Sequence, residues 1–217
     1  METFVVIGLG RFGSAVAEEL SDLGHQVLAI DTDQDAVQRM ADRVTQAVVG
    51  DCRDMEVLKA LGVGHARCAV VAFSDDIGNS VLITLNLKEL GIQRIVCKAR
   101  SAAHEELLRR IGADQVVFPE QESGRNLAHT LNNREILEYI QLSDTYSIVK
   151  TEVPGSWVEK SLAELEVRRN YRVTIVAIQN GSGDMQTAPL PDYVFRSGDL
   201  LFSLGKNEDN DRVITLE

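Results

Sequence analysis

The sequence predicts a doubly wound α/β domain followed by a smaller domain of mixed α+β type. Apolar runs of strand length alternate with helical patterns up to Pro119, and a glycine-rich turn, G-x-G-x-x-G, follows the first run. After Pro119 the alternation gives way to a mixed pattern. Regular strand–helix alternation is typical of a parallel sheet that is covered by helices on both faces.

The predicted strands of the first domain are rich in Val and Ile and lack strict apolar–polar alternation. Parallel strands that are buried on both faces show this pattern. The six runs cover residues 4–7, 26–30, 46–49, 68–73, 94–97 and 115–118.

Helical patterns lie between these runs, beginning with residues 14–20 after the glycine-rich turn. Four of the patterns end at a glycine, namely Gly24, Gly62, Gly91 and Gly112. Glycine just past the last turn is a common signal for the end of a helix. Six strand–helix units in this order predict a Rossmann-type sheet.

The second domain is predicted to begin near Arg134. A helix is expected at about residues 121–131 and a second short helix at 134–140, so we divide the chain into domains 1–133 and 134–217. The remaining predicted elements are a strand at 146–153, a short helix at 161–165, a strand at 173–178, a turn at 181–183 and a strand at 200–204. This domain is too small to carry a substrate site of its own.

Composition excludes several functional classes. The 217 residues carry a formal charge of −11, and the pI is near 4.9, which argues against general binding to nucleic acid. Three cysteines without metal-ligand spacing indicate reduced core thiols in a cytoplasmic protein. We expect no signal peptide, and no segment reaches the roughly 18 apolar residues of a membrane span. Any membrane role would therefore act through a partner.

The glycine-rich turn has the spacing of a dinucleotide-binding fingerprint. In such a turn Gly8 permits the tight bend, Gly10 lets the backbone approach phosphate, and Gly13 lets the helix pack on the strand. The phosphate lies at the N-terminus of the helix, where free N–H groups favour an anion. Arg11 adds a fixed cation at the same place, so we expect a nucleotide phosphate there.

The ends of the next two predicted strands carry acidic residues. Asp31 lies about 20 residues beyond the turn, where a carboxylate accepts hydrogen bonds from ribose and disfavours the 2′-phosphate of NADP. The alternative for Asp31 and Asp33 is capping of the next helix, which we prefer for Asp33. Asp51 and Cys52 end the third strand, where an adenine edge would pass. Capping of a helix at residues 53–61 explains Asp51 equally well.

The later strand ends supply cations. Lys98 and Arg100 end the fifth strand and, with Arg11, would suit a triphosphate, although solvation at the surface is the alternative for Arg100. Ser74 ends the fourth strand, with a turn residue as its alternative. The full set of predicted nucleotide contacts is Gly8, Gly10, Arg11, Phe12, Gly13, Asp31, Thr32, Asp51, Cys52, Phe73, Ser74, Lys98 and Arg100.

Glu120 follows the sixth strand and has two interpretations. It binds Mg²⁺ or Ca²⁺ beside the nucleotide, or it stabilises the start of the next helix through the helix dipole. The residues alone favour the second interpretation.

No proton-transfer group accompanies the predicted nucleotide contacts, because the second domain contains no histidine and the chain has no Walker A or G-x-S-x-G motif. We therefore predict no catalytic residues and favour a nucleotide sensor over an enzyme.

Several motifs occur in a characteristic order along the chain. They are Gly8-Leu9-Gly10-Arg11-Phe12-Gly13, Leu87-Lys88-Glu89-Leu90, Ile111-Gly112-Ala113-Asp114, Phe118-Pro119-Glu120, the run at residues 142–149, Ser161-Leu162 and Arg196-Ser197-Gly198-Asp199. Together they resemble the RCK (regulating conductance of K⁺) subunits of bacterial Ktr-type potassium uptake systems, with one RCK N-domain and one TrkA-C type C-domain. The resemblance covers nearly the whole chain.

The resemblance implies a cytoplasmic gating subunit that forms dimers and an octameric ring beneath a membrane K⁺-translocating subunit. It implies that ATP and ADP bind the N-domains and set the shape of the ring. Arg11 then contacts the terminal phosphate of a nucleotide held by the neighbouring subunit, Asp31 binds ribose, and Glu120 binds a divalent cation, which reverses the preference stated above.

Two further ligands belong to this interpretation. In several relatives the C-domain dimer binds cyclic di-AMP, and the corresponding region here holds Leu162, Leu165, Arg169, Tyr171 and Pro191. The alternative function is an NAD(H)-binding redox sensor or an NAD-dependent oxidoreductase, because Asp31 serves NAD(H) as well as ATP.

Overall fold

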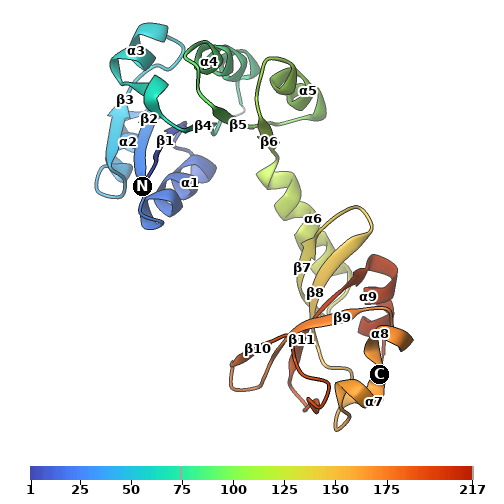
Figure 1. Cartoon of the computed structure of the whole chain (residues 1–217). Coiled ribbons are helices and arrows are strands. Elements are labelled where there is room, and N and C mark those ends of the chain that lie inside the picture. Colours follow the sequence, from blue (N-terminus) through green and yellow to red (C-terminus); the bar gives the residue numbers. More distant parts are fainter. Residues whose placement is uncertain (74, 217) are drawn as a thin grey trace. The chain divides into compact units, whose positions relative to one another are not determined.

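The computed structural model describes residues 1–73 and 75–216, so the prediction for Ser74 lies outside the described residues. The chain forms two compact units, Met1–Pro119 and Glu120–Glu217, which are described separately below (Figure 1). None of the described helices is long and apolar enough to cross a membrane.

The first unit contains a six-stranded sheet in the order β3-β2-β1-β4-β5-β6. Neighbouring strands are parallel throughout, and the order reverses between β1 and β4. This is the predicted doubly wound, Rossmann-type topology. The strands are β1 (Thr3–Ile7), β2 (Gln26–Asp31), β3 (Gln46–Val49), β4 (Cys68–Val71), β5 (Arg94–Lys98) and β6 (Gln115–Val117).

Helices cover both faces of this sheet, as Figure 1 shows. Val5 and Ile7 of β1 belong to the core beneath α3, α4 and α5, whereas Val6 belongs to the core beneath α1 and α2. Burial on alternate faces explains why the strands are apolar without alternation. The helices are α1 (Arg11–Asp22), α2 (Gln34–Met40), α3 (Met55–Ala60), the short η1 (Val63–His65), α4 (Ile77–Glu89) and α5 (Ala102–Arg110).

The second unit contains a five-stranded antiparallel sheet in the order β10-β9-β11-β8-β7, as expected of an α+β domain. Its core centres on Trp157 and Phe195, which are fully buried. The elements are β7 (Ile136–Gln141), β8 (Tyr146–Glu152), η2 (Gly155–Trp157), α7 (Leu162–Leu165), α8 (Val167–Asn170), β9 (Thr174–Gln179), β10 (Met185–Thr187), β11 (Leu200–Lys206) and α9 (Asn207–Ile214).

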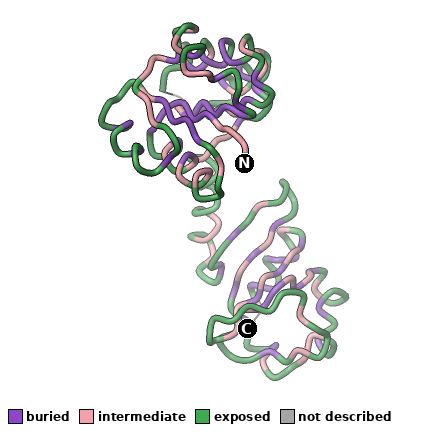
Figure 2. Tube along the Cα trace, turned by 60° about the vertical axis from the view of Figure 1, so that its left-hand side comes forward, coloured by how far each residue is buried: buried purple, intermediate pink, exposed green. Residues whose placement is uncertain are grey.

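Helix α6 (Pro119–Asn132) begins at the division between the units, and none of its residues is buried (Figure 2). The predicted second helix at residues 134–140 is wrong, because this segment forms strand β7. Ile136 and Tyr139 are paired with Thr151 and Val149 of β8, and both are buried. Pairing with β8 overrides the weak local preference for helix. The segment between the domains therefore contains one helix instead of two.

Candidate nucleotide-binding site

The candidate site lies where the strand order reverses in the first unit. The loop after β1 and the segment after β4 are neighbours there, at the carboxyl ends of parallel strands. Open α/β sheets bind ligands at this switch point. The structure therefore brings the glycine-rich turn and Phe73 to one edge of the sheet.

The three glycines of the turn occupy different environments. Gly8 has φ +94°, and a β-carbon there would lie 3.0 Å from Cδ1 of Phe73. At Gly13 a β-carbon would lie 1.9 Å from the carbonyl oxygen of Gly8 and 2.9 Å from Cβ of Ala72. A β-carbon at Gly10 would meet no atom within 4 Å. Gly8 thus permits the turn with positive φ beside Phe73, Gly13 lets α1 pack closely on the preceding backbone, and Gly10 leaves space beside the backbone.

Helix α1 begins at Arg11, immediately after this open position. Its N-cap Gly10 provides no side-chain hydrogen bond, and its first turn contains no acidic residue. The first N–H groups of a helix need acceptors, and its dipole favours an anion. Arg11 is exposed and Phe12 half-buried at the same end. This end of α1 is suited to a phosphate group.

The carboxylate of Asp31 is fixed beside the turn. It accepts hydrogen bonds from the backbone N–H groups of Leu9 at 2.5 Å and Asp33 at 2.9 Å. Each carboxylate oxygen has a further lone pair for a ribose hydroxyl. Asp33 caps α2 by accepting from the Asp35 N–H at 2.9 Å, which confirms its predicted role. The adjoining Thr32 is exposed.

Asp51 does not cap α3, so that alternative is wrong. Asp54 is the N-cap, since its side chain accepts from the Glu56 N–H. Asp51 instead forms a salt bridge with Arg53, whose guanidinium lowers the pKa of the Asp51 carboxyl. Cys52 is buried, and burial with the nearby charges of Asp51 and Asp31 raises the pKa of its thiol to about 12.

The cations after β5 lie at the same edge of the sheet. Lys98 is the last residue of β5 and is half-buried, whereas Arg100 is exposed. Nη1 of Arg100 donates to the carbonyl oxygen of Asp75 at 3.2 Å, which connects the loops after β5 and β4. The sequence did not indicate this bond or the Arg53 salt bridge, although a cation two residues after Asp51 was a usable signal.

Glu120 lies in the second unit, in the first turn of α6. Glu122 occupies the same turn, and both charges suit the N-terminal end of a helix dipole. Among residues 1–73 and 75–216, no three His, Cys, Asp or Glu side chains are grouped so that they could hold a metal ion. A cation at Glu120 would thus need oxygens from elsewhere, as Mg²⁺ takes them from substrate phosphates and water.

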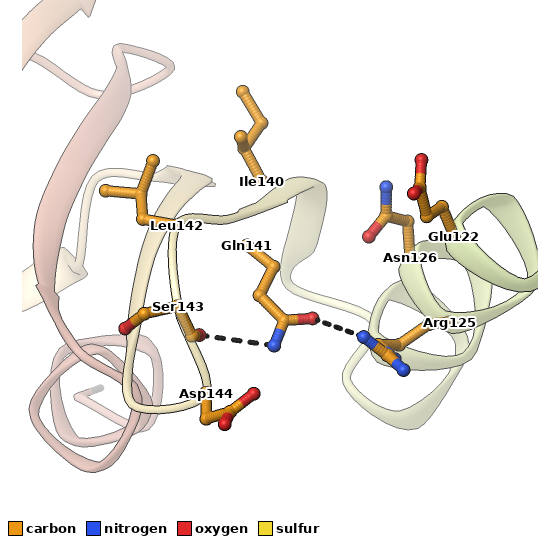
Figure 3. A pocket seen from close by; sticks show the side chains of 8 residues that line it. All are labelled: Glu122, Arg125, Asn126, Ile140, Gln141, Leu142, Ser143 and Asp144. Carbon is orange, nitrogen blue, oxygen red and sulfur yellow. Dashed lines mark hydrogen bonds between the residues drawn. The ribbon is translucent and has the colours of Figure 1, made fainter. Parts of the chain in front are cut away.

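The second unit also contains an open cavity of about 340 Å³ beside α6 and the β7–β8 turn (Figure 3). Gln141 crosses it, accepting from Nη1 of Arg125 at 3.2 Å and donating to the carbonyl oxygen of Ser143 at 3.2 Å. None of the predicted site residues lines it. The lining residues are Glu122, Arg125, Asn126, Ile140, Gln141, Leu142, Ser143 and Asp144.

The residues suggested for cyclic di-AMP are only partly brought together. Helix α7 is joined to the Pro191 loop by a hydrogen bond from the Ala163 N–H to the Pro191 carbonyl at 2.8 Å. Leu165, however, is buried in the core, and the Tyr171 ring lies 5.0 Å from that of Trp157. Leu165 therefore has little surface for a ligand.

Comparison with known proteins agrees with this architecture. The TrkA-N domain family matches residues 4–119, and the TrkA-C domain family matches residues 148–216. Ktr system potassium uptake protein C of Bacillus subtilis is 38% identical over 96% of this chain and 94% of its own length. Ktr system potassium uptake protein A of the same species is 39% identical over 95% and 92%.

Solved structures show the same fold. The GsuK channel bound to NAD matches 99% of this chain with 26% identity and a TM-score of 0.57. This chain spans 38% of that channel chain. The resemblance seen in the sequence motifs is thus confirmed, and so is the expectation of a non-enzymatic RCK protein. The chain belongs to the RCK family of proteins that join a TrkA-N domain to a TrkA-C domain, close to the Ktr system potassium uptake proteins.

Proposed function

We propose that this chain is the cytoplasmic, nucleotide-sensing gating subunit of a Ktr-type potassium uptake system. It would act on a membrane K⁺-translocating subunit and would have no nucleic-acid partner. The similarity to two Ktr system potassium uptake proteins over more than 90% of each chain supports this assignment. The observation that carries the sensing role is the uncapped start of α1 with Arg11, beside the fixed carboxylate of Asp31.

The proposed ligands are ATP and ADP, which would compete for the site at the switch point. An uncapped helix end binds a phosphate, and Asp31 would accept from a free ribose 2′-hydroxyl. Arg11, Lys98 and Arg100 place more positive charge at this edge than a diphosphate needs. Arg11 would read the additional phosphate of ATP, held by the neighbouring subunit, because its planar fork binds phosphate oxygens and stays charged.

NAD(H) is the second candidate ligand, and one observation favours it. The similar GsuK channel has been solved with NAD bound. The Asp31 geometry serves either ligand, since both contain an adenosine with a free 2′-hydroxyl. In this version the chain would sense redox state.

Gating requires that the ligand bind two states of an assembly with different affinities. An arginine that reaches a γ-phosphate across a subunit boundary would provide this difference. We therefore propose that the chain forms dimers and an octameric ring. Exposed apolar side chains support self-association: Leu127 and Leu131 of α6, and Leu82 and Leu85 of α4, are each between 43% and 73% exposed.

Calorimetric titration of the full chain with ATP, ADP, NADH and NADPH tests this proposal. We expect ATP and ADP to bind, and NADPH to bind more weakly than NADH. NADH binding much more tightly than ATP would favour the redox sensor. If none of the four nucleotides binds, the chain would be a structural scaffold, contrary to the proposal.

The divalent site is tested by replacing Glu120. In the wild-type protein Mg²⁺ or Ca²⁺ should strengthen ATP binding, because the cation would bridge Glu120 and the phosphates. Glu120→Gln should abolish this enhancement, whereas Glu122→Gln in the same helical turn should leave it intact. Enhancement that survives in Glu120→Gln would assign Glu120 to the helix start alone.

Cyclic di-AMP in the C-domain is a further part of the proposal. Leu162 and Pro191 would contribute apolar surface, since their segments are hydrogen-bonded neighbours. Titration of cyclic di-AMP into the full chain and into its Pro191→Asp variant tests this part separately. Equal binding by both proteins would remove Pro191 from the site.

A further inference from the structure

A salt bridge between Asp51 and Arg53 lies at the carboxyl end of β3. Nε of Arg53 donates to Oδ1 of Asp51 at 2.8 Å, and Nη2 donates to Oδ2 at 2.6 Å. The backbone N–H of Arg53 also donates to Oδ1 at 3.0 Å. Both carboxylate oxygens are therefore occupied by Arg53, and the carboxylate compensates the charge of the guanidinium.

This pair adjoins the position proposed for ribose. Strand β3 is the neighbour of β2, and the Gly50 N–H donates to the carbonyl oxygen of Asp31 at 2.9 Å. The charges of Asp51 and Asp31 also raise the pKa of the buried Cys52 thiol. Asp31 and the salt bridge thus follow neighbouring strands at the carboxyl edge of the sheet.

The pair is accessible to a ligand. The side chains of Arg53 and Asp51 are 49% and 40% exposed. Exposed ion pairs add little to stability, so the chain should fold without this one. Its consequence is the local charge: without Asp51, the guanidinium would lose its bound carboxylate beside the ribose and would keep only the through-space charge of Asp76. Arginine in that position accommodates the 2′-phosphate of NADP in related folds.

We propose that Asp51 determines specificity at the ribose 2′-position by holding and neutralising Arg53, so that the site accepts a free 2′-hydroxyl and rejects a 2′-phosphate. Asp51 acts through Arg53 and is a positioning residue. The inference rests on the proposed nucleotide site. A 2′-phosphate carries close to two negative charges; it would meet Asp31 together with an already neutralised guanidinium, and would be repelled.

The test compares nucleotides that differ only by a 2′-phosphate. AMP is paired with adenosine 2′,5′-bisphosphate, and NADH with NADPH, and the ratio of dissociation constants is measured for the full chain. Wild-type protein should bind the 2′-phosphorylated member about tenfold more weakly or worse. Asp51→Asn frees Arg53 to bind the 2′-phosphate. This variant should shift the ratio of dissociation constants about tenfold in favour of the 2′-phosphorylated nucleotide, which is the effect of one charge-assisted hydrogen bond.

Two further variants control this result. The double variant Asp51→Asn with Arg53→Gln should return the ratio to the wild-type value, because the local charge is restored. Glu56→Gln, which frees Lys59 from a comparable exposed ion pair of 2.9 Å on α3, should leave the ratio unchanged. Should Asp51→Asn fail to fold, Arg53→Gln alone serves: it leaves Asp51 uncompensated and should deepen the rejection several-fold.

The outcomes separate the two proposals. The role of Asp51 would be overturned if AMP or NADH binds but Asp51→Asn leaves the ratio of dissociation constants unchanged. If Arg53→Gln is used instead, an unchanged ratio in that variant has the same meaning. In either case the nucleotide site would still stand. Absence of binding for these four nucleotides and for ATP and ADP in the wild-type protein would overturn the nucleotide site, and the specificity role with it.

Discussion

Gly13 combines a packing role with the geometry of the proposed phosphate site. Its missing side chain lets α1 approach β1 so closely that the Gly8 carbonyl occupies the space of a β-carbon. The same approach aims the first N–H groups of α1 at the switch point. Packing and ligand binding therefore depend on one residue, and a substitution there affects both.

Gly13→Ala should destabilise the protein by about 2–3 kcal/mol, because a β-carbon 1.9 Å from a backbone oxygen forces helix and strand apart. Urea unfolding measures this change. Gly10→Ala is the matched control, since a β-carbon there meets nothing within 4 Å, and it should cost within about 1 kcal/mol. Equal losses in the two variants would contradict the packing role of Gly13.

Arg11→Ala should weaken ATP binding more than ADP binding, because the proposed contact is with the phosphate that ADP lacks. Competition titration gives, for each nucleotide, the ratio of the dissociation constants of variant and wild type. The ratio for ATP should exceed that for ADP about tenfold, as expected for a charge-assisted contact. Arg39→Ala, an exposed arginine in the last turn of α2, is the control. Equal losses for ATP and ADP would show that Arg11 does not distinguish them.

Helices α4 and α5 are joined by buried polar side chains near the carboxyl edge of the sheet. The Ser80 hydroxyl lies 2.8 Å from Nε2 of His104, and Oγ1 of Thr84 donates to the Ser80 carbonyl at 2.7 Å. His104 is 1% exposed. Burial, and to a lesser degree the charge of Arg100, lower the pKa of His104, so the fold holds this imidazole neutral.

The stability of the first unit should therefore fall in acid. The unfolded chain binds a proton at His104 near pH 6.5, above the lowered folded pKa, so unfolding becomes easier as the pH falls through that range. For one proton, the free energy of unfolding changes by at most about 1.4 kcal/mol per pH unit. Urea unfolding at several pH values measures it. His104→Gln should flatten the slope, whereas exposed His65→Gln should not; equal slopes in wild type and His104→Gln would refute this account.

At the scale of the whole molecule, α6 presents apolar side chains that the described chain does not bury. A helix with Leu127 at 58% and Leu131 at 73% exposure presents two apolar side chains on one face, because they are four residues apart. A neighbouring subunit would cover this face in the proposed assembly.

Replacing Leu127 and Leu131 with Lys should shift sedimentation of the protein towards smaller species, since the charges cannot be buried in an interface. Leu23→Lys is the control, because Leu23 is 64% exposed beyond the end of α1. A wild-type protein that sediments as a monomer at all concentrations would contradict the proposed ring. So would an assembly unaffected by the double replacement.

The first domain was predictable because its elements follow from local rules. Strands buried on both faces are continuously apolar, and a G-x-G-x-x-G turn between strand and helix has one common geometry. Asp31 followed from its spacing to that turn. The predicted site residues of this domain accordingly lie at one edge of the sheet, apart from Ser74, outside the described residues, and Glu120, in the second unit.

The second domain was less predictable because distant contacts decide its elements. Residues 136–141 form strand β7 through pairing with β8. The polar sequence of α9 gave no sign that one side of this helix is buried. There Asn210 accepts a hydrogen bond of 2.8 Å from Ser203 and donates bonds of 3.0–3.1 Å to Ser147. Ser147 lies 63 residues before Asn210, so local patterns contain no sign of that contact.

The amino-acid order alone was sufficient for the doubly wound sheet, the glycine-rich turn and the position of the Asp31 carboxylate, because each follows from local strand, turn and helix patterns and their spacing. Tertiary structure alone decided that His104 is buried against Ser80 and that β7 joins the second sheet. Both features depend on contacts between residues that are far apart in the sequence, because burial and strand pairing arise only when distant segments meet in space.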